Sequence, residues 1–397
     1  MLKLHARVAE LRGPSGLFSL ETRADLPTVL RPSKAFLVRN VHEPLPTGFA
    51  LYIFVGAEET AGSFCAAPHV VLSTDFRYLG QEDVIRLTDD GHIRVLVRAN
   101  SPHNTILVTE QCNHYCLMCS QPPKDGDDSW LLEEVRQLLP MIPRTAEHLG
   151  FTGGEPTLFG EDFLDILRLA KARLPHTSLH VLSNGRRFAD SSFARSYAGI
   201  AHPDLMVGIP VYSDDPARHD YVVQAYGAFD ETIRGILNLK RLQQKVELRV
   251  VLHQQTIERL PKLAEYIARN LLFVDQVALM GLEIMGFTRA NLESLWIDPG
   301  DYRDVLSEAV AILDAYGMRC AVYNHPLCLV NRDVEHVYVK SISDWKNEYA
   351  SECGPCTRQQ ECGGFFSSGI KHAYSRQLRP FLTSTNWPVK LSPSRLS

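Results

Sequence analysis

Hydrophobic and polar positions change rhythm along the chain, and the clearest rhythm runs from about residue 105 to residue 317. Short runs rich in apolar and β-branched residues alternate there with amphipathic segments, a pattern that predicts strands and helices in turn. The predicted strands are Thr105–Thr109, His148–Thr152, Leu179–Leu182, Leu205–Ile209, Val246–Leu252 and Val274–Met280. The predicted helices are one capped by Ser129, then Glu161–Arg173, Ser191–Gly199, Asp230–Gln243, Glu258–Leu271 and Asp301–Tyr316, the last closed by Gly317.

Six strand–helix units in this stretch predict an α/β fold, a parallel barrel of the TIM type or an open part of one. Periodicity alone does not separate such a partial (β/α)6 barrel from a doubly wound sheet. In either fold the functional residues are expected at the C-terminal ends of the strands.

Residues 1–100 follow a different pattern. Short apolar alternations at Ala50–Val55 and His69–Ser73 are broken by Gly, Pro and polar turns, and Asp90-Gly91 separates two β-rich runs as in a hairpin. We therefore expect a β-rich N-terminal domain over 1–100, a core over 101–317 and a C-terminal extension over 318–397.

Composition removes several classes of function. The 397 residues carry 41 basic and 46 acidic side chains, a formal net charge of −5, so the basic excess of nucleic-acid-binding proteins is missing. The sequence has no apolar run long enough to span a bilayer, and its first residues lack the apolar core of a secretory signal. We expect a cytoplasmic protein without a nucleic-acid or membrane partner.

Nine cysteines in such a chain suggest metal centres more than disulfides. Cys112, Cys116 and Cys119 form one group, Cys353, Cys356 and Cys362 form another, and Cys65, Cys320 and Cys328 are scattered. Cys65 has no partner in sequence and is expected to be a small buried apolar residue. Structural zinc remains an alternative for both groups, because C-x2-C pairs suit zinc.

The first group, in TEQCNHYCLMCSQPP, has C-x3-C-x2-C spacing directly after the first predicted strand. Three thiolates from one loop can ligate three irons of a cubane and leave the fourth iron open, as catalytic metal sites require. His114, between the cysteines, is interpreted as a solvent-facing spacer.

This loop resembles the signature of the radical S-adenosylmethionine (SAM) superfamily. The resemblance implies a catalytic [4Fe-4S] cluster on Cys112, Cys116 and Cys119, with SAM bound to the open iron. The residue before the third cysteine is usually aromatic in relatives and is Met118 here, which is expected to pack against the adenine.

Later strand ends extend the resemblance. GFTGGEPTL is similar to the superfamily's GGEP motif, which implies that Gly153, Gly154 and Glu155 receive the amine of SAM; LSNGRR places Ser183 and Asn184 near the cofactor. Arg249 is a candidate for the cofactor carboxylate, with an outward structural arginine as the alternative. Met280 and Gly281, in VALMGLE, are candidates for the adenine, with plain core as the alternative.

The second group, in ECGPCTRQQECGGFF, resembles the auxiliary-cluster extension (SPASM, or its shorter twitch relative) of peptide-modifying radical enzymes. Phe366 replaces the usual fourth cysteine, which suggests one auxiliary [4Fe-4S] cluster instead of two. Cys328 is the first choice for the missing ligand and Cys320 the second.

The combined motifs resemble the C-type radical SAM maturase of His-Xaa-Ser systems, over roughly residues 100–370. That resemblance implies an oxidoreductase acting on a ribosomally made peptide, beside a second radical SAM maturase and an electron donor such as flavodoxin or ferredoxin. Two alternatives stay open: a non-catalytic iron–sulfur subunit of the second enzyme, and a small-molecule radical enzyme of the cyclase type.

Overall fold

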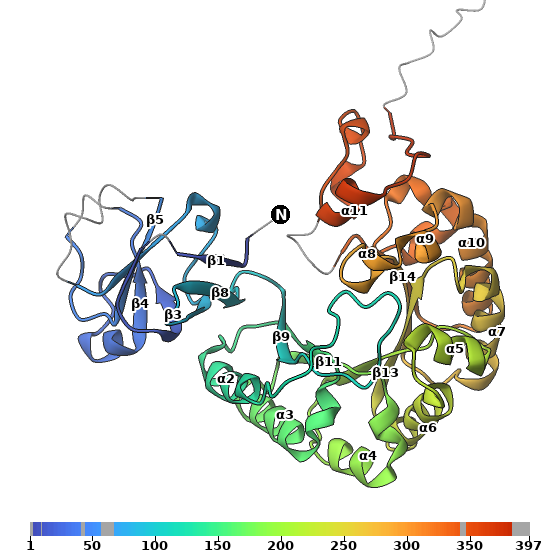
Figure 1. Ribbon diagram of the computed structural model, residues 1–397, viewed down its shortest axis with the longest axis horizontal. Coiled ribbons are helices and arrows are strands. Elements are labelled where there is room, and N and C mark those ends of the chain that lie inside the picture. The colour runs from blue at the N-terminus through green and yellow to red at the C-terminus, as the bar shows by residue number, and fades with distance from the viewer. Residues whose placement is uncertain (1–2, 9, 41–43, 57–66, 342–346, 383–397) are drawn as a thin grey trace, which may run out of the picture.

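A curved sheet of seven parallel strands forms the centre of the computed structural model, which describes residues 3–8, 10–40, 44–56, 67–341 and 347–382 (Figure 1). Its strands follow one another in chain order across the sheet. They are His103–Thr109 (β9), His148–Gly153 (β10), Ser178–Leu182 (β11), Leu205–Pro210 (β12), Lys245–Leu252 (β13), Gln276–Gly281 (β14) and Cys320–Tyr323 (β15). Because the strand order never reverses, the sheet is part of a barrel, and the doubly wound alternative is wrong.

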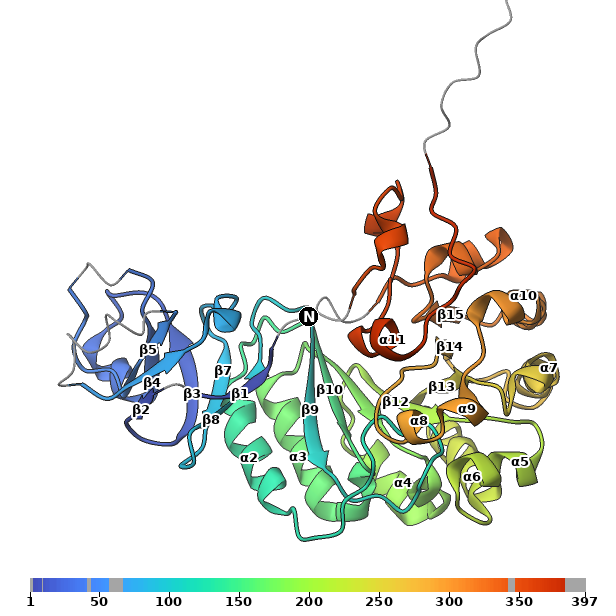
Figure 2. The same ribbon diagram turned by 45° about the horizontal axis from the view of Figure 1, so that its top comes forward.

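The helices lie along the convex side of this sheet, as both ribbon views show (Figure 2). They are Trp130–Leu138 (α2), Glu161–Arg173 (α3), Ser191–Ala198 (α4), Pro216–Val223 (α5), Ala228–Arg241 (α6), Leu260–Asn270 (α7) and Pro299–Ala315 (α10). Three shorter helices lie after β14: Phe287–Ala290 (α8), Leu292–Leu295 (α9) and Ser367–His372 (α11).

Alternation along each strand separates the two faces of the sheet. On β13, Val246, Leu248 and Val250 join the apolar core shared with the helices, whereas Glu247 and Arg249 point to the concave side. The same core contains Phe151 of β10 and Val207 of β12. The apolar side is thus closed by helices, and the concave side is left for polar side chains.

All six strands predicted from the sequence are present, but two local predictions are wrong. The sheet has a seventh strand, β15, beyond the expected end of the core at residue 317. Ser129 does not cap α2: it has helical backbone angles, and its N–H instead donates to Asp127 Oδ1 at 3.0 Å.

The N-terminal region forms a separate mixed sheet of eight strands with its own apolar cores. In spatial order the strands are His5–Arg7 (β1), His92–Val97 (β8), Val84–Leu87 (β7), Gly16–Glu21 (β3), Lys34–Leu37 (β4), Leu51–Val55 (β5), His69–Leu72 (β6) and Glu10–Arg12 (β2). The predicted hairpin at Asp90-Gly91 joins β7 to β8, with Gly91 at φ +78°.

This sheet packs beside β9, the edge strand of the central sheet. Val84 and Val97 enter the core of the central domain, and Glu134 of α2 pairs with Arg94 at 2.5 Å and with Arg86 at 3.6 Å. The C-terminal segment lies at the opposite edge, beside β15 (Figure 2). Among the described residues, no helix is both long and apolar enough to cross a membrane.

Candidate active site

The loop that carries Cys112, Cys116 and Cys119 follows β9 and lies over the C-terminal ends of the central strands. Backbone hydrogen bonds hold it on one side, from Gly154 N–H to Thr109 O (2.8 Å) and from Glu155 N–H to Gln111 O (2.7 Å). On the other side, the N–H groups of residues 115 and 117 donate to carbonyls at the end of α5. The loop is therefore fixed by main-chain contacts to two separate elements.

Two glycines of β10 make this seat possible. A Cβ atom on Gly154 would lie 1.9 Å from Gln111 O, and one on Gly153 would lie 2.2 Å from Thr109 O. The resemblance implied that these glycines receive the amine of SAM, and that contact stays a prediction. In the structure, what approaches them is the backbone of the cysteine loop itself.

The three thiols of this loop are partly buried and influence one another. Burial raises the pKa of Cys112 to about 12, and it raises the pKa of Cys116 and of Cys119 as well. Repulsion between neighbouring thiolates contributes to the shifts at Cys112 and Cys116, so the sulfurs share one environment. Binding of a metal would have to stabilise the thiolate forms.

A site for a single zinc ion would need a tighter arrangement of side chains than a cubane cluster does. Among the described residues, no group of three or more His, Cys, Asp and Glu side chains lies close enough together to hold one metal ion. A tetrahedral zinc ion draws its ligands in to about 2–2.3 Å. A cubane holds its cysteine sulfurs further apart, each at its own iron.

His114 corrects the sequence interpretation. It is 3% exposed, not solvent-facing, and neither ring nitrogen has a hydrogen-bond partner among the described residues. Burial lowers its pKa to about 3, so the ring is neutral. Its backbone N–H donates to Cys112 Sγ at 3.4 Å.

Glu155 connects the ends of β10 and β11. Its carboxylate accepts hydrogen bonds from Thr157 N–H (3.0 Å), from Ser183 Oγ (2.8 Å) and from Asn184 N–H (2.5 Å). The side chain is 1% exposed, and burial raises its pKa. The role visible in the structure is to position these strand ends, and contact with the amine of SAM stays a prediction.

Asn113 and Thr157 belong to this network, although the sequence analysis did not single them out. Asn184 Nδ2 donates to Asn113 Oδ1 at 2.6 Å and so connects β11 to the cysteine loop. Thr157 Oγ1 donates to Glu155 Oε1 at 2.6 Å. In the sequence, only their positions could have pointed to them: Asn113 directly follows Cys112, and Thr157 lies two residues after Glu155.

Met118 packs beneath the loop in a small apolar cluster. Its neighbours there include Tyr212, Val222 and Leu295, and it is 6% exposed. Tyr212 is another residue that the sequence analysis did not single out. Burial raises its pKa, and the negative charges of the three loop thiolates raise it further. The predicted contact of Met118 with adenine is not visible in this arrangement and stays a prediction.

Arg249 lies on the concave face of the sheet, which removes the outward-facing alternative. Its guanidinium donates to Glu247 Oε1 at 2.8 Å and to Met280 Sδ at 3.1 Å. Gly208 leaves room for it, since a Cβ there would lie 2.9 Å from Arg249 Cδ. Gly281 packs against β15, where a Cβ would meet Asn324 O at 2.3 Å.

The second group of cysteines lines one apolar cavity of about 390 Å³. Cys328, Cys353, Cys356 and Cys362 all contribute to its wall, together with Tyr349 and Phe381. Cys362 Sγ also accepts a hydrogen bond from the N–H of Leu327 at 3.2 Å. Three cysteines of one segment and Cys328 from another therefore line the same space.

Cys320 does not take part in that cavity. It begins β15 and packs at the edge of the main core, where burial raises its pKa to about 12. Cys65 lies outside the described residues.

Comparison with known protein families finds a match that includes the cysteine loop. Residues 106–267 match the model of the radical SAM superfamily. The pyruvate formate-lyase-activating enzyme of Clostridium pasteurianum is 24% identical over 200 residues, which are 47% of this chain and 77% of that protein. The residues matched by this model include the first cysteine group and strands β10 to β13.

Solved structures with similarity include Streptococcus suis SuiB bound to S-adenosylmethionine, with a TM-score of 0.45 and 16% identity over 56% of this chain and 50% of that chain. Native anSMEcpe with bound AdoMet has a TM-score of 0.43 and 17% identity over 55% of this chain and 62% of that chain. The match therefore spans about half the length of SuiB.

Proposed function

We propose that this chain is a radical SAM enzyme that abstracts a hydrogen atom from a ribosomally made peptide of the His-Xaa-Ser type. The observation that carries the proposal is the seat of the cysteine loop. The loop that carries the three thiols is held over the ends of the central strands by Gly154 and Glu155.

The residues present fit a [4Fe-4S] cluster with SAM on its open iron. The donors are three cysteine sulfurs from one loop, in a protected environment in which neighbouring His114 is neutral and brings no competing charge. When bound and reduced by one electron, SAM supplies a 5′-deoxyadenosyl radical that takes a hydrogen atom from the substrate.

The chain's own residues would prepare the site for that chemistry. The Glu155 network fixes the loop relative to β11, so that Asn184 and Ser183 stay in register with the cysteines. Arg249 and Met280 line the concave face at the ends of neighbouring strands. Such a preformed site orients the reactants and excludes water from a reactive intermediate.

We further propose one auxiliary [4Fe-4S] cluster on Cys328, Cys353, Cys356 and Cys362. Their shared cavity supports this ligand set, and Cys320 is not among the described residues that line that cavity, which argues against it as the fourth ligand. Such a cluster would accept one electron from the substrate radical, which gives an oxidative modification or crosslink. The first electron would come from a donor such as flavodoxin or ferredoxin, and a second radical maturase would act on the same peptide.

The test is release of 5′-deoxyadenosine by the reconstituted protein after reduction. Replacing Cys112, Cys116 and Cys119 together by Ala should remove about four irons and abolish that release, because each thiolate ligates one corner of the cluster. Cys320→Ala is the matched control and should keep both. Release by the triple variant would refute the site, and absence of release from the intact holoprotein would favour a non-catalytic subunit.

A further inference from the structure

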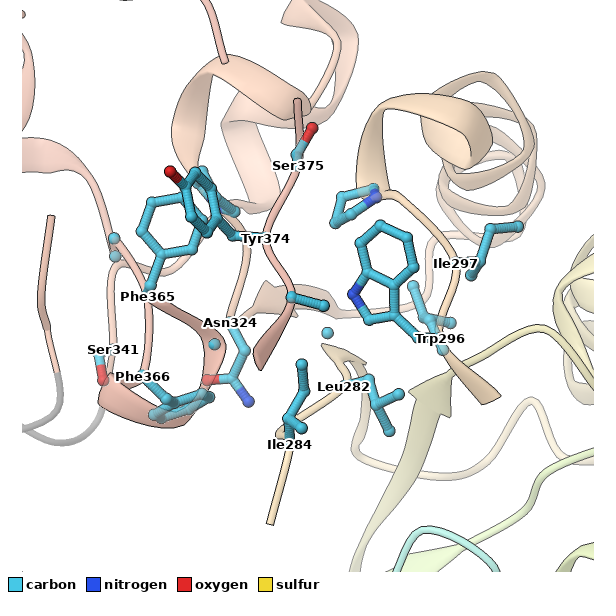
Figure 3. Close-up of a pocket in the computed structure, with 18 of the residues that line it drawn as sticks. Leu282, Ile284, Trp296, Ile297, Asn324, Ser341, Phe365, Phe366, Tyr374 and Ser375 are labelled. Atoms are coloured by element: carbon cyan, nitrogen blue, oxygen red, sulfur yellow. The ribbon is translucent and has the colours of Figure 1, made fainter. Parts of the chain in front are cut away.

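An open pocket of about 700 Å³ lies between the central sheet and the C-terminal segment (Figure 3). One wall comes from the ends of β13, β14 and β15, through Leu252, Gly281 and Asn324. The facing wall comes from residues 363–375, directly after Cys362. The pocket has the size of a site for a small molecule or for a side chain with its flanking backbone.

Aromatic rings surround this space. Figure 3 shows the indole of Trp296 on one side and the ring of Phe366 across from it, with Leu282 and Ile284 between them. Phe365 and Tyr374 stand edge to face at the far wall, with ring centroids 5.5 Å apart. Faces and edges of several rings at one site favour an aromatic guest, because such pairs add about 0.5–1.5 kcal/mol beyond area burial.

Two polar groups among the residues that line the pocket are the carboxamide of Asn324 and the indole N–H of Trp296. Asn324 directly follows β15 and has a left-handed backbone, φ +61°, and Figure 3 shows its amide beside Phe366 and Ile284. Both groups can bond to the main chain or the polar edge of a guest.

Charge narrows the choice of guest. None of the described residues that line the pocket is acidic, and the ammonium group of Lys340 already donates to Gln360 O at 2.7 Å. Among these described lining residues, a cationic guest would find no counter-ion, and an anionic guest would find only this engaged lysine. A neutral guest pays the smallest free-energy cost of leaving water when it enters the pocket.

The pocket also lies between the two cysteine sites. Gly281 ends β14 on the catalytic side, and Gly364 and Phe365 line both this pocket and the cavity of the second cysteine group. A side chain in the pocket would therefore be next to the catalytic strand ends and one residue layer from the auxiliary thiols.

We propose that this pocket binds a neutral aromatic side chain of the peptide substrate, an assignment that rests on the proposed function. Trp296 and Phe366 contact the ring, and Asn324 bonds to the peptide group beside it. The pocket then selects which residue of the peptide is brought between the two cysteine sites.

The probes for the test are blocked amino acids: N-acetylphenylalanine amide, N-acetylleucine amide and N-acetyllysine amide. They are titrated into the holoprotein, with its iron reconstituted and SAM present, and binding is followed by calorimetry. We expect the phenylalanine probe to bind roughly tenfold more tightly than the leucine probe. Trp296→Ala should remove that preference, and the matched control Trp130→Ala, on α2 beside the N-terminal sheet, should keep it.

Asn324→Asp provides a second test that keeps the left-handed backbone, since Asp tolerates it as Asn does. The added carboxylate should shift the preference from the phenylalanine probe to the lysine probe. The proposal is overturned if the aromatic preference is absent, if it survives Trp296→Ala, or if Asn324→Asp leaves it unchanged. Because binding needs no turnover, an aromatic preference without release of 5′-deoxyadenosine would refute the proposed function and leave the pocket assigned.

Discussion

Gly154 shows that a single missing side chain decides whether the cysteine loop can sit on the sheet. Its Cβ would lie 1.9 Å from Gln111 O and 3.0 Å from Cys112 Cβ. A backbone carbonyl cannot rotate away as a side chain can, so the loop itself would have to move.

We therefore expect Gly154→Ala to lower the iron content and to reduce release of 5′-deoxyadenosine by roughly 100-fold, the cost of a displacement of about 1 Å at a reacting centre. Iron analysis and product quantification measure the two effects. Gly199→Ala is the control, since its Cβ would meet only carbonyls at 3.3 Å and 3.4 Å. Equal activity of both variants would show that the close approach is not what positions the loop.

His253 predicts how stability depends on pH. It is fully buried, and neither ring nitrogen has a partner among the described residues. Burial lowers its pKa to about 4 from 6.5, so the unfolded chain binds a proton in this window and the folded chain does not. The contribution of neutral His253 to the free energy of unfolding is thus fully present above pH 6.5. It falls by about 3 kcal/mol as the pH drops toward 4.

His253→Phe should make this slope shallower by the share of one residue, since other buried histidines such as His114 also have a lowered pKa; urea unfolding at pH 7 and pH 5 would measure the difference. The exposed His336→Gln should leave the slope as it is. If His253→Phe has the same slope as the unmodified protein, the ring is not held neutral by the fold.

The cysteines and the strand-end motif were identified from the sequence, but their surroundings were not. The resemblance placed Cys112 and Glu155 in one site, and Asn184 connects Glu155 to Asn113, the residue after Cys112. His114 was misplaced because a loop has no periodicity that tells an inward residue from an outward one. Trp296 and Phe366 come from segments 70 residues apart, so only the fold brings them together.

At the scale of elements, prediction succeeded where apolar periodicity was strong. The six strands and the helix Glu161–Arg173 were found within one or two residues, because each has a buried face that repeats. Strand β15 was missed because its four residues, CAVY, are too short to show a repeat. Its pairing with β14 comes from the sheet, not from the local sequence.

The short 3-10 helix Leu327–Leu329 after β15 brings Cys328 to the auxiliary cavity. In a protein that already lacks Cys112, Cys116 and Cys119, we expect about four irons to remain. Cys328→Ala should then remove most of that iron, because it takes away one of four ligands, whereas Cys320→Ala should not. Iron analysis and the visible absorption of the cluster measure the outcome. Zinc at this site without iron absorption would refute the electron-transfer role. Iron loss on Cys320→Ala, with iron kept on Cys328→Ala, would make Cys320 the fourth ligand instead of Cys328.

At the scale of the whole molecule, two additions stand at opposite edges of the central sheet. The N-terminal sheet packs beside β9, and the C-terminal segment packs beside β15 (Figure 2). The sequence indicated both additions through their change of pattern. It could not indicate on which edge each would lie, because that depends on contacts such as Glu134 with Arg94.

The N-terminal sheet is either a recognition module for the peptide or partner enzyme, or a structural cap on the barrel. Its own cores, which contain Leu20, Ile53 and Phe54, support an independent unit, and its sheet ends in the short edge strands β1 and β2. An exposed edge can bind an extended peptide through main-chain hydrogen bonds. The shared core at Val84 and Val97 instead supports the cap.

Deleting residues 1–95 separates these roles. We expect the shortened protein to lose a few degrees in Tm, because Glu134 loses both arginines and the central core loses Val84. It should keep its iron and its release of 5′-deoxyadenosine without peptide, since the cysteine loop is held by β10 and α5 and not by the N-terminal sheet. Modification of the peptide, followed by mass spectrometry, should be lost. The variant Glu134→Gln in the full chain is the control, because it weakens the contact and keeps the sheet. Aggregation or loss of iron on deletion would establish the cap, and a mass shift that survives deletion would exclude recognition by these residues.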